Sequence, residues 1–272
     1  MNPPQPVVVV TDVEKRVFGS PESADALDFL ATRAIPLVIN ASRTRAEIER
    51  LHHTLHIVTP FISENGAALF LPQGCLPFVP HQARRGMSGD VIDFGLPYAQ
   101  VVDILRRTAR QHHVEIVKFA DLSIEEVSRE LDVSLAEARL AKLREYSELF
   151  RIVHETEAVR HRLVASLHRQ GLRCRPTGCH YVVTAAPDRA DSVRTLRAMW
   201  KRASKDPLVI GLGDTLDDVP WLRQVDIPVI VQTDGEEVTR KMLASLPHAH
   251  VTRRHGPTGW SEAVFYLLGA YQ

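Results

Sequence analysis

The chain has 272 residues, of which 44% are hydrophobic and 24% charged, and its 33 Lys and Arg residues balance its 33 Asp and Glu residues. A protein that neutralises many phosphates needs a basic surplus, so this balance argues against nucleic acid or an anionic membrane surface as a partner. Average apolar content and low net charge exclude a disordered chain and predict a folded protein of one large or two smaller domains.

The N-terminal segment and the cysteines indicate the compartment. No Lys or Arg precedes the apolar run at 7–10, and that run is too short for a signal-peptide core or a membrane span. Cys75, Cys174 and Cys179 are an odd number without paired spacing, so we expect reduced thiols rather than disulfides. These features predict a cytoplasmic protein and leave its oligomeric state open.

The first third of the chain alternates strand and helix patterns. Continuous apolar runs are typical of strands buried on both faces, and apolar residues at helical spacing predict helices between them. The predicted strands cover 7–11, 35–39, 57–63 and 69–71, the predicted helices cover 22–33 and 43–53, and a tight turn covers 64–67. This order predicts a mostly parallel sheet with helices on both faces.

The middle of the chain follows a different pattern, and the last third returns to the first. A polar, basic stretch at 80–89 predicts a linker. After it we expect strands at 91–94 and 149–153, helices at 99–111, 124–131, 135–144 and 154–170, and a hairpin at 173–184 that turns at 176–178. Beyond the hairpin we expect helices at 191–203, 219–224, 236–246 and 261–268, and strands at 208–212 and 227–231. The economical interpretation is an α/β core formed by 1–82 and 184–272, with 83–183 inserted as an α/β cap.

Acidic residues follow two of the predicted buried strands. Asp12 and Glu14 follow the first strand, and Asp214 and Asp218 follow the strand at 208–212. Doubly wound sheets bind ligands beyond the carboxyl ends of their strands, so these carboxylates are expected to share one crevice. Converging carboxylates require a cation, and Mg²⁺ suits them because it binds a few carboxylates and keeps several waters. Mg²⁺ beside an Asp nucleophile supports phosphoryl transfer through an aspartyl-phosphate.

The chain resembles the haloacid dehalogenase (HAD) superfamily in these motifs. The resemblance rests on Asp12-x-Glu14, on a motif-two position after the second strand, on a basic residue before a late helix, and on Gly213-Asp214-x-x-x-Asp218. The segments 40–47, 64–67 and 144–148 are further similar to mannosyl-3-phosphoglycerate phosphatases, over nearly the whole chain. The resemblance implies a Rossmann-like core with an inserted α/β cap, and Mg²⁺-dependent hydrolysis of mannosyl-3-phosphoglycerate or a related sugar or glycerate phosphate.

The resemblance also implies roles for individual residues. Asp12 is expected to be the nucleophile, Glu14 the general acid and base, and Arg189 the group that balances the phosphoryl charge. Asp12, Glu14 and Asp214 are expected to bind the metal, with Asp218 as a supporting metal-site residue. The implied substrate-binding residues are Ser42, Arg43, Arg144, Glu145, Tyr146, Ser147 and Gly178.

Several positions depart from the family pattern, among them Lys15 and Arg16, which stand where the family has a Gly and a Thr. Glu14 stands where the family has Asp, and Arg189 where it has Lys. Ala41 takes the place of a phosphate-binding Ser or Thr, and Thr177-Gly178-Cys179 replaces a Gly-Gly-Arg hairpin. Charge-stabilising groups in such sites can each be worth a factor of about 10² to 10³ in rate. The sequence therefore leaves open a second hypothesis, a catalytically impaired HAD-like protein that binds a ligand or regulates.

Each motif also has a purely structural interpretation. Thr11 and Glu14 fit a capping box, and the acidic residues at 214–218 fit the first turn of a helix. Arg189 fits a solvated residue at a helix start, and 144–148 fits the solvated, charge-rich end of a helix. The paired carboxylates after two buried strands favour the catalytic interpretation over these alternatives.

Overall fold

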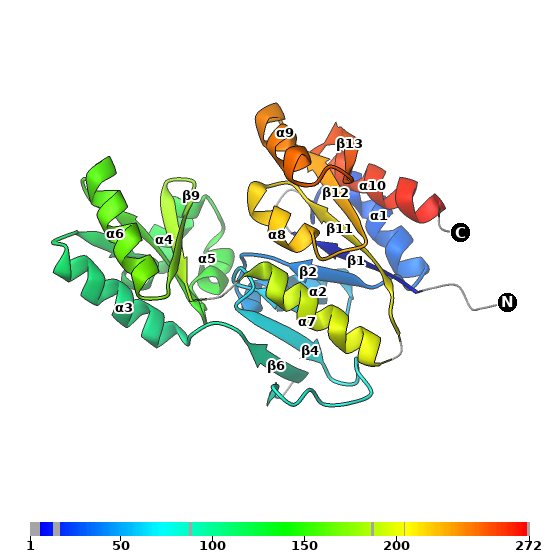
Figure 1. Ribbon diagram of the computed structural model, residues 1–272, viewed down its shortest axis with the longest axis horizontal. Coiled ribbons are helices and arrows are strands. Elements are labelled where there is room, and N and C mark those ends of the chain that lie inside the picture. The colour runs from blue at the N-terminus through cyan, green and yellow to red at the C-terminus, as the bar shows by residue number, and fades with distance from the viewer. Residues whose placement is uncertain (1–5, 13–16, 87–88, 186–187, 204, 271–272) are drawn as a thin grey trace.

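The computed structural model describes residues 6–12, 17–86, 89–185, 188–203 and 205–270. These residues form a nine-stranded sheet and a separate antiparallel four-stranded sheet. Figure 1 shows the two sheets in two bodies, which we call the core and the cap. The described part of the chain begins and ends in the core, on the side away from the cap.

The core sheet has the strand order β13-β12-β11-β1-β2-β3-β4-β6-β5. Neighbours from β13 to β3 are parallel, and the pairs from β3 to β5 are antiparallel. The strands are β1 (Val7–Thr11), β2 (Leu37–Asn40), β3 (Phe61–Ser63), β4 (Ala68–Pro72), β5 (Arg84–Arg85), β6 (Gly89–Asp93), β11 (Leu208–Gly213), β12 (Ile227–Gln232) and β13 (His250–His255). The predicted mostly parallel sheet is confirmed.

Helices cover both faces of the core sheet. They are α1 (Pro21–Thr32), α2 (Arg45–Leu55), α7 (Arg189–Arg202), α8 (Val219–Leu222), α9 (Glu236–Ser245) and α10 (Gly256–Ala270). Apolar residues of α1 and α10 pack on one face with alternate residues of β1 and β11, and those of α7, α8 and α9 pack on the other. Val9 and Val10 of β1 point to opposite faces and are both 1% exposed, which explains the unbroken apolar run of that strand.

The cap sheet has the order β7-β8-β10-β9, and its neighbouring strands are antiparallel. The cap elements are α3 (Tyr98–Gln111), β7 (Ile116–Lys118), α4 (Ile124–Leu131), α5 (Leu135–Ala141), β8 (Ser147–Ile152), α6 (Glu157–Arg169), β9 (Arg173–Thr177) and β10 (His180–Thr184). Apolar residues of α3 and α6 pack on one face of this sheet, and those of α4 and α5 on the other. An apolar cluster of its own is consistent with a separately packed cap.

Three parts of the fold differ from the sequence prediction. Residues 84–85 and 89–93, placed in the cap by the predicted boundary at 83, pair with β4 in the core sheet, so the cap sheet and its helices begin after β6. The strands β7 and β13 were not predicted, because β7 has only three residues and β13 (HVTRRH) is a polar edge strand without an apolar run.

None of the helices in the described ranges is both long and apolar enough to cross a bilayer.

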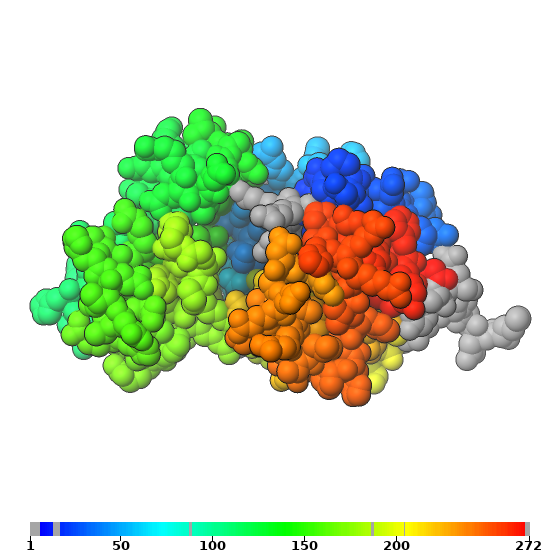
Figure 2. Space-filling view, turned by 90° about the horizontal axis from the view of Figure 1, so that it is seen from above, coloured from blue at the N-terminus to red at the C-terminus, as the bar shows by residue number. Residues whose placement is uncertain are grey.

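The cap is attached to the core by a buried carboxylate. Glu64, in the turn before β4, is 0% exposed and has a positive φ of 46°. Its carboxylate accepts hydrogen bonds from the backbone N–H groups of Glu145 and Tyr146 at 2.8 and 3.1 Å, and from the Ser147 hydroxyl at 2.5 Å. In Figure 2 the green cap and the blue-to-red core form two lobes, with a recess between the cap hairpin and the orange segment of the core.

Candidate active site

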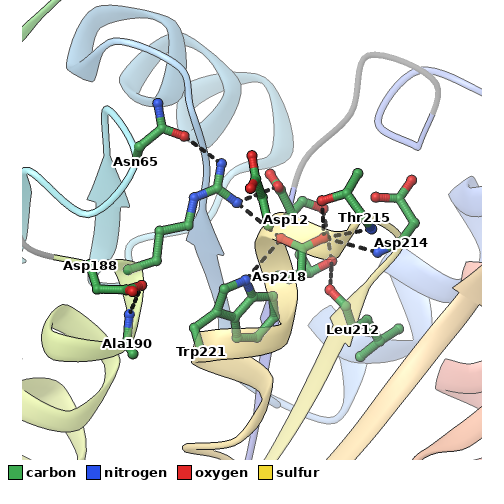
Figure 3. A network of polar contacts seen from close by, with 12 residues as sticks. Asp12, Asn65, Asp188, Ala190, Leu212, Asp214, Thr215, Asp218 and Trp221 are labelled. Atoms are coloured by element: carbon green, nitrogen blue, oxygen red, sulfur yellow. Dashed lines mark hydrogen bonds and ion pairs between the residues drawn. The ribbon is translucent and has the colours of Figure 1, made fainter. Parts of the chain in front are cut away.

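Asp12 lies at the carboxyl end of β1, next to the end of β11. Its backbone N–H donates to the carbonyl oxygen of Leu212 at 3.2 Å, so the two strand ends stay side by side beyond the sheet. The Thr11 hydroxyl accepts a hydrogen bond from the Trp260 indole at 3.1 Å and lies 3.4 Å from the carbonyl oxygen of Leu212. The capping box expected from Thr11 and Glu14 lies partly outside the described residues. The predicted juxtaposition of the two acidic strand ends is therefore present (Figure 3).

Arg189 joins the acidic groups at these strand ends. It is the first residue of α7, where the Asp188 side chain caps the helix by accepting from the Ala190 N–H at 3.1 Å. One terminal nitrogen, Nη1, donates to Asp12 Oδ2 at 2.6 Å and to Asp218 Oδ1 at 3.0 Å. The other, Nη2, donates to Asn65 Oδ1 at 2.8 Å. Arg189 is only 5% exposed, so the solvated helix-start alternative does not describe it.

Both carboxylate oxygens of Asp218 accept hydrogen bonds from protein donors. Asp218 is 0% exposed, and its Oδ2 accepts from the N–H groups of Asp214 and Thr215 at 3.0 and 2.9 Å and from the Thr215 hydroxyl at 2.9 Å. Its Oδ1 accepts from the Trp221 indole at 2.9 Å in addition to Arg189. With both oxygens engaged by protein donors, Asp218 is suited to fixing the Asp214 loop and Arg189 rather than to binding a cation directly.

The electrostatics of Asp12 depend on its burial. Removal from water raises the pKa of Asp12 from 3.8 to about 7, with the nearby Asp218 charge also raising it and Arg189 opposing the shift. For Arg189, burial lowers the pKa, but the charges of Asp12 and Asp218 outweigh this and raise it above its ordinary value. A carboxylate with such a pKa changes charge near neutral pH, which is typical of functional sites.

The carboxylates of Asp12 and Asp214 are the groups that could hold a cation here. The Asp214 N–H is fixed by Asp218, and Asp214 and Asp12 lie at the ends of adjacent strands (Figure 3). Carboxylate oxygens are ligands that Mg²⁺ prefers, and a cation would offset the desolvation cost of ionised Asp12, so the donor chemistry fits. The part of the chain that is described contains no cluster of three or more His, Cys, Asp or Glu residues able to hold a metal. Glu14, the third predicted metal ligand and the predicted general acid, lies outside the described residues.

Two buried donors near Arg189 lack partners. Among the described residues, Arg189 Nε and Asn65 Nδ2 are buried side-chain nitrogens without a hydrogen-bond partner. Both side chains line a narrow crevice that is also lined by Arg173 and Arg175 of β9. A buried donor left unpaired costs about 1–3 kcal/mol, and an anionic ligand can remove that cost.

Known proteins are similar to this chain in sequence over nearly its whole length. The chain is 33% identical over 260 residues to a glucosyl-3-phosphoglycerate/mannosyl-3-phosphoglycerate phosphatase of Methanococcoides burtonii, a match that spans 95% of this chain and 94% of the relative. The chain belongs to this phosphatase family. A relative of the same description from Persephonella marina is 28% identical over 269 residues, covering 96% of this chain and 97% of its own length. No family model matches the chain.

Solved structures, one of them from the HAD superfamily, have a fold similar to that of this chain. A HAD-superfamily phosphatase from Bacteroides thetaiotaomicron has a TM-score of 0.65 at 17% identity, with 97% of this chain and 96% of that chain covered. A protein from Thermotoga maritima has a TM-score of 0.65 at 15% identity, with coverages of 95% and 96%. The predicted HAD fold and the predicted class of phosphoric monoester hydrolase are confirmed.

The predicted substrate-binding residues of this family member are spread over the junction between core and cap. Tyr146 and Ser147 are buried and, with Glu145, bind Glu64, so the segment attaches the cap and is not a solvated helix end. Arg144 donates to the Ser147 hydroxyl at 2.8 Å and to the carbonyl oxygen of Ser42, itself an exposed residue, at 3.4 Å.

The other two predicted substrate-binding residues, Arg43 and Gly178, make none of the contacts described for segment 144–147. Arg43 lies 4.0 Å from Glu47 and lines a cavity of about 780 Å³ between α2 and the cap. Gly178 is exposed at the turn of the β9–β10 hairpin with a φ of 59°. The structure thus brings Arg189 into direct contact with Asp12 and Asp218. It does not bring the predicted substrate-binding residues to this contact.

Three residues at the site were not predicted to be functional. Asn65 was interpreted only as a turn residue, yet its side chain holds Arg189. Arg175 lies 3.0 Å from Asp217 in the core loop, and Arg173 lies 3.3 Å from Asp188. The signal was available in the sequence, because basic residues at alternate positions of a strand lie on one face. It was missed because the family resemblance pointed instead to the hairpin turn, where the family arginine is absent.

Proposed function

We propose that this phosphatase hydrolyses the phosphate ester of mannosyl-3-phosphoglycerate, of its glucosyl counterpart or of a related sugar or glycerate phosphate, using Mg²⁺ and an aspartyl-phosphate at Asp12. The relatives that span the chain carry both substrates in their names. The single observation that carries the proposal is the contact of Arg189 with both Asp12 and Asp218 at the ends of β1 and β11.

The contacts of Asp12 suggest how it acts. Arg189 donates to Oδ2, so Oδ1 is the oxygen that we propose attacks phosphorus. The bond from phosphorus to the ester oxygen breaks as the bond to Oδ1 forms, and Glu14 supplies a proton to the departing oxygen. Glu14 then removes a proton from the water that attacks phosphorus and releases Asp12 and inorganic phosphate.

Arg189 and Asn65 are proposed to receive the phosphoryl oxygens. Arg189 Nε and Asn65 Nδ2 are buried donors that a phosphoryl oxygen can satisfy, and the guanidinium balances its charge. Mg²⁺, held by Asp12 and Asp214 with Asp218 supporting their loop, would supply further charge neutralisation at the phosphoryl group. The guanidinium contacts three side chains at once, which a lysine ammonium with one nitrogen does less well.

The cap arginines are proposed to select the substrate. Arg173 and Arg175 face the crevice beside Arg189 and make ion pairs with the core loops at Asp188 and Asp217. A substrate with a second anionic group, such as a glycerate carboxylate, can exchange these partly exposed pairs for contacts of its own. The proposed substrates carry such a group.

A phosphate-release assay tests the proposal. The full chain is incubated with mannosyl-3-phosphoglycerate, glucosyl-3-phosphoglycerate, 3-phosphoglycerate and mannose 6-phosphate, with Mg²⁺ or with EDTA. We expect Mg²⁺-dependent release from at least one glycosyl phosphoglycerate and a loss of several orders of magnitude in Asp12→Asn, since removal of a catalytic nucleophile can cost about 10⁶-fold in kcat. Release from none of the four above the Asp12→Asn control would favour a ligand-binding protein instead.

A further inference from the structure

The end of β2 carries a buried amide that has no hydrogen-bond partner. Asn40, the last residue of this strand, is 0% exposed, and neither its Nδ2 nor its Oδ1 is hydrogen-bonded to any of the described residues. The large majority of buried side-chain polar atoms in proteins have a partner, so an amide that the fold leaves unpaired requires an explanation. The roles proposed for Asp12, Arg189 and Asn65 do not involve Asn40.

The register of the sheet places Asn40 level with Asp12. In the parallel pair of β1 and β2, Thr11 lies opposite Ile39. The next residue along each strand is therefore Asp12 on β1 and Asn40 on β2, and the Asp12 N–H continues the ladder by donating to the carbonyl oxygen of Leu212. Neighbouring strands lie about 4.8 Å apart, and the two side chains are equally long, so one ligand can contact both.

Both side chains point to the face of the sheet that α7 covers. Val10 and Val38, which precede Asp12 and Asn40 by two residues, belong to the apolar cluster that contains the buried apolar residues of α7. Side chains two residues apart on a strand share a face, so Asp12 and Asn40 lie on the α7 side. Arg189 is the first residue of that helix and approaches the strand ends from this side.

The contacts of Arg189 extend across the end of β2. Its terminal nitrogens bind Asp12 after β1 and Asn65 in the turn after β3, and these two residues lie on opposite sides of the guanidinium (Figure 3). Because β2 lies between β1 and β3 in the sheet, Asn40 lies between these two contacts. Arg189 Nε and Asn65 Nδ2 are also buried and unpaired within the described ranges. Three unpaired N–H donors beside one carboxylate suit an oxyanion, which accepts from all of them.

We propose that Asn40 is a catalytic residue whose Nδ2 donates a hydrogen bond to an oxygen of the phosphoryl group as that group is transferred to Asp12. The inference rests on the proposed function, in which Asp12 attacks phosphorus. No proton leaves the amide, and the bonds that form and break at phosphorus are those given above. A donor that is already fixed in the free protein stabilises the charge of the transition state without reorganisation. The hydrogen bond that Asn40 lacks is then gained only with the phosphoryl group.

Asn40→Leu tests the proposal, because leucine keeps the number and branching of the side-chain heavy atoms and removes both polar groups. Steady-state kinetics with a glycosyl phosphoglycerate should show kcat lowered about 10²-fold, the scale for loss of one fixed donor. Calorimetry should show binding of inorganic phosphate, in the presence of Mg²⁺, weakened about tenfold. The urea unfolding midpoint should match or exceed that of the wild-type protein, because the free protein loses no hydrogen bond and no longer buries an unpaired amide.

Ser63→Ala is the matched control. Ser63 is the last residue of the neighbouring strand β3, is 0% exposed, and has an Oγ that is likewise unpaired among the described residues. It follows Ile62, which lies opposite Asn40 and belongs to the cluster on the α7 side, so the Ser63 side chain points to the other face of the sheet. Its substitution should leave kcat and the affinity for phosphate unchanged.

The outcomes separate this role from the proposed function. Equal kcat and equal phosphate affinity in Asn40→Leu and Ser63→Ala would overturn the role of Asn40 and leave the proposed function in place. A wild-type protein that hydrolyses no glycosyl phosphoglycerate, yet binds phosphate more tightly than Asn40→Leu, would contradict the proposed function and support the contact of Asn40 with phosphate. A wild-type protein that binds no phosphate contradicts the contact.

Should Asn40→Leu not fold, Asn40→Ala takes its place in the same measurements. A lower urea midpoint in Asn40→Ala with unchanged kcat and unchanged phosphate affinity would make Asn40 a structural residue and overturn the proposal. A lower kcat with weaker phosphate binding would support it.

Discussion

Replacing Asp12 by asparagine should stabilise the protein at neutral and alkaline pH. The pKa of Asp12 is raised from 3.8 to about 7, so the folded state binds a proton that the unfolded state has released. A raised pKa contributes stability that is fully present below the unfolded pKa and is lost as the pH rises through the folded pKa. At about 1.4 kcal/mol per pKa unit, the loss in wild type reaches roughly 4 kcal/mol above pH 7. The asparagine side chain resembles protonated Asp12 and does not titrate.

The difference in stability between Asp12→Asn and the wild-type protein should change with pH. From the same two pKa values, Asp12 lowers the free energy of unfolding by about 2 kcal/mol at pH 5 and by about 4 kcal/mol at pH 8, relative to its value at low pH. The stability advantage of Asp12→Asn should therefore grow by roughly 2–3 kcal/mol between these pH values. Urea unfolding in EDTA at pH 5, 6, 7 and 8 measures it, with EDTA present because a bound cation would favour ionised Asp12.

Asp217→Asn is the matched control for this experiment. Asp217 is also a carboxylate at the site, but its side chain is 55% exposed and pairs with Arg175 rather than with Arg189. Its substitution should change stability by less than about 1 kcal/mol, because the pair with Arg175 is partly exposed. An Asp12→Asn advantage that is constant from pH 5 to 8, or a net loss of stability at pH 8, would refute the electrostatic reasoning.

Three further predictions concern the groups around Asp12. Arg189→Lys should lower kcat by about 10-fold or more, because one ammonium cannot keep the contacts with Asp12, Asp218 and Asn65; steady-state kinetics check it, and an unchanged kcat would contradict the role of the guanidinium. Arg175→Ala should raise KM about 10-fold or more for glycosyl phosphoglycerates with a smaller change in kcat, and equal effects on a phosphate ester without a carboxylate would argue against substrate selection. Glu64→Gln should lower the free energy of unfolding by about 1–3 kcal/mol, since the amide accepts at only one atom where the carboxylate accepts three hydrogen bonds; urea unfolding that matches wild type would show that this attachment is dispensable.

The sequence predicted the parts of the fold that depend on local patterns. The buried run of β1 and the helical spacing of α3 each depend on residues within one element, and both elements are present within a residue or two of their predicted bounds. The strands β5 and β6 were assigned to the cap because their pairing with β4 is a long-range contact that no local pattern records. The polar edge strand β13 was missed for the same reason.

The site was predictable where topology alone determines it. The ends of β1 and β11 are adjacent because the strands pair in parallel, so Asp12 and the Asp214 loop meet there. The partner of Arg189 in the turn, Asn65, could not be predicted, because its side chain reaches across from β3 and β4 only in the folded chain. The saturation of Asp218 by five donors likewise follows from the packed loop and not from residue spacing.

Trapping the covalent intermediate tests the central claim most directly. The full chain is mixed with a glycosyl phosphoglycerate and Mg²⁺, quenched in acid during turnover and treated with borohydride, which reduces an aspartyl-phosphate to homoserine. Peptide mass spectrometry should find homoserine at position 12 in the wild-type protein only when substrate is present. Phosphate release in the same sample with unmodified Asp12, or with the label on another carboxylate, would contradict the assignment of Asp12 as nucleophile.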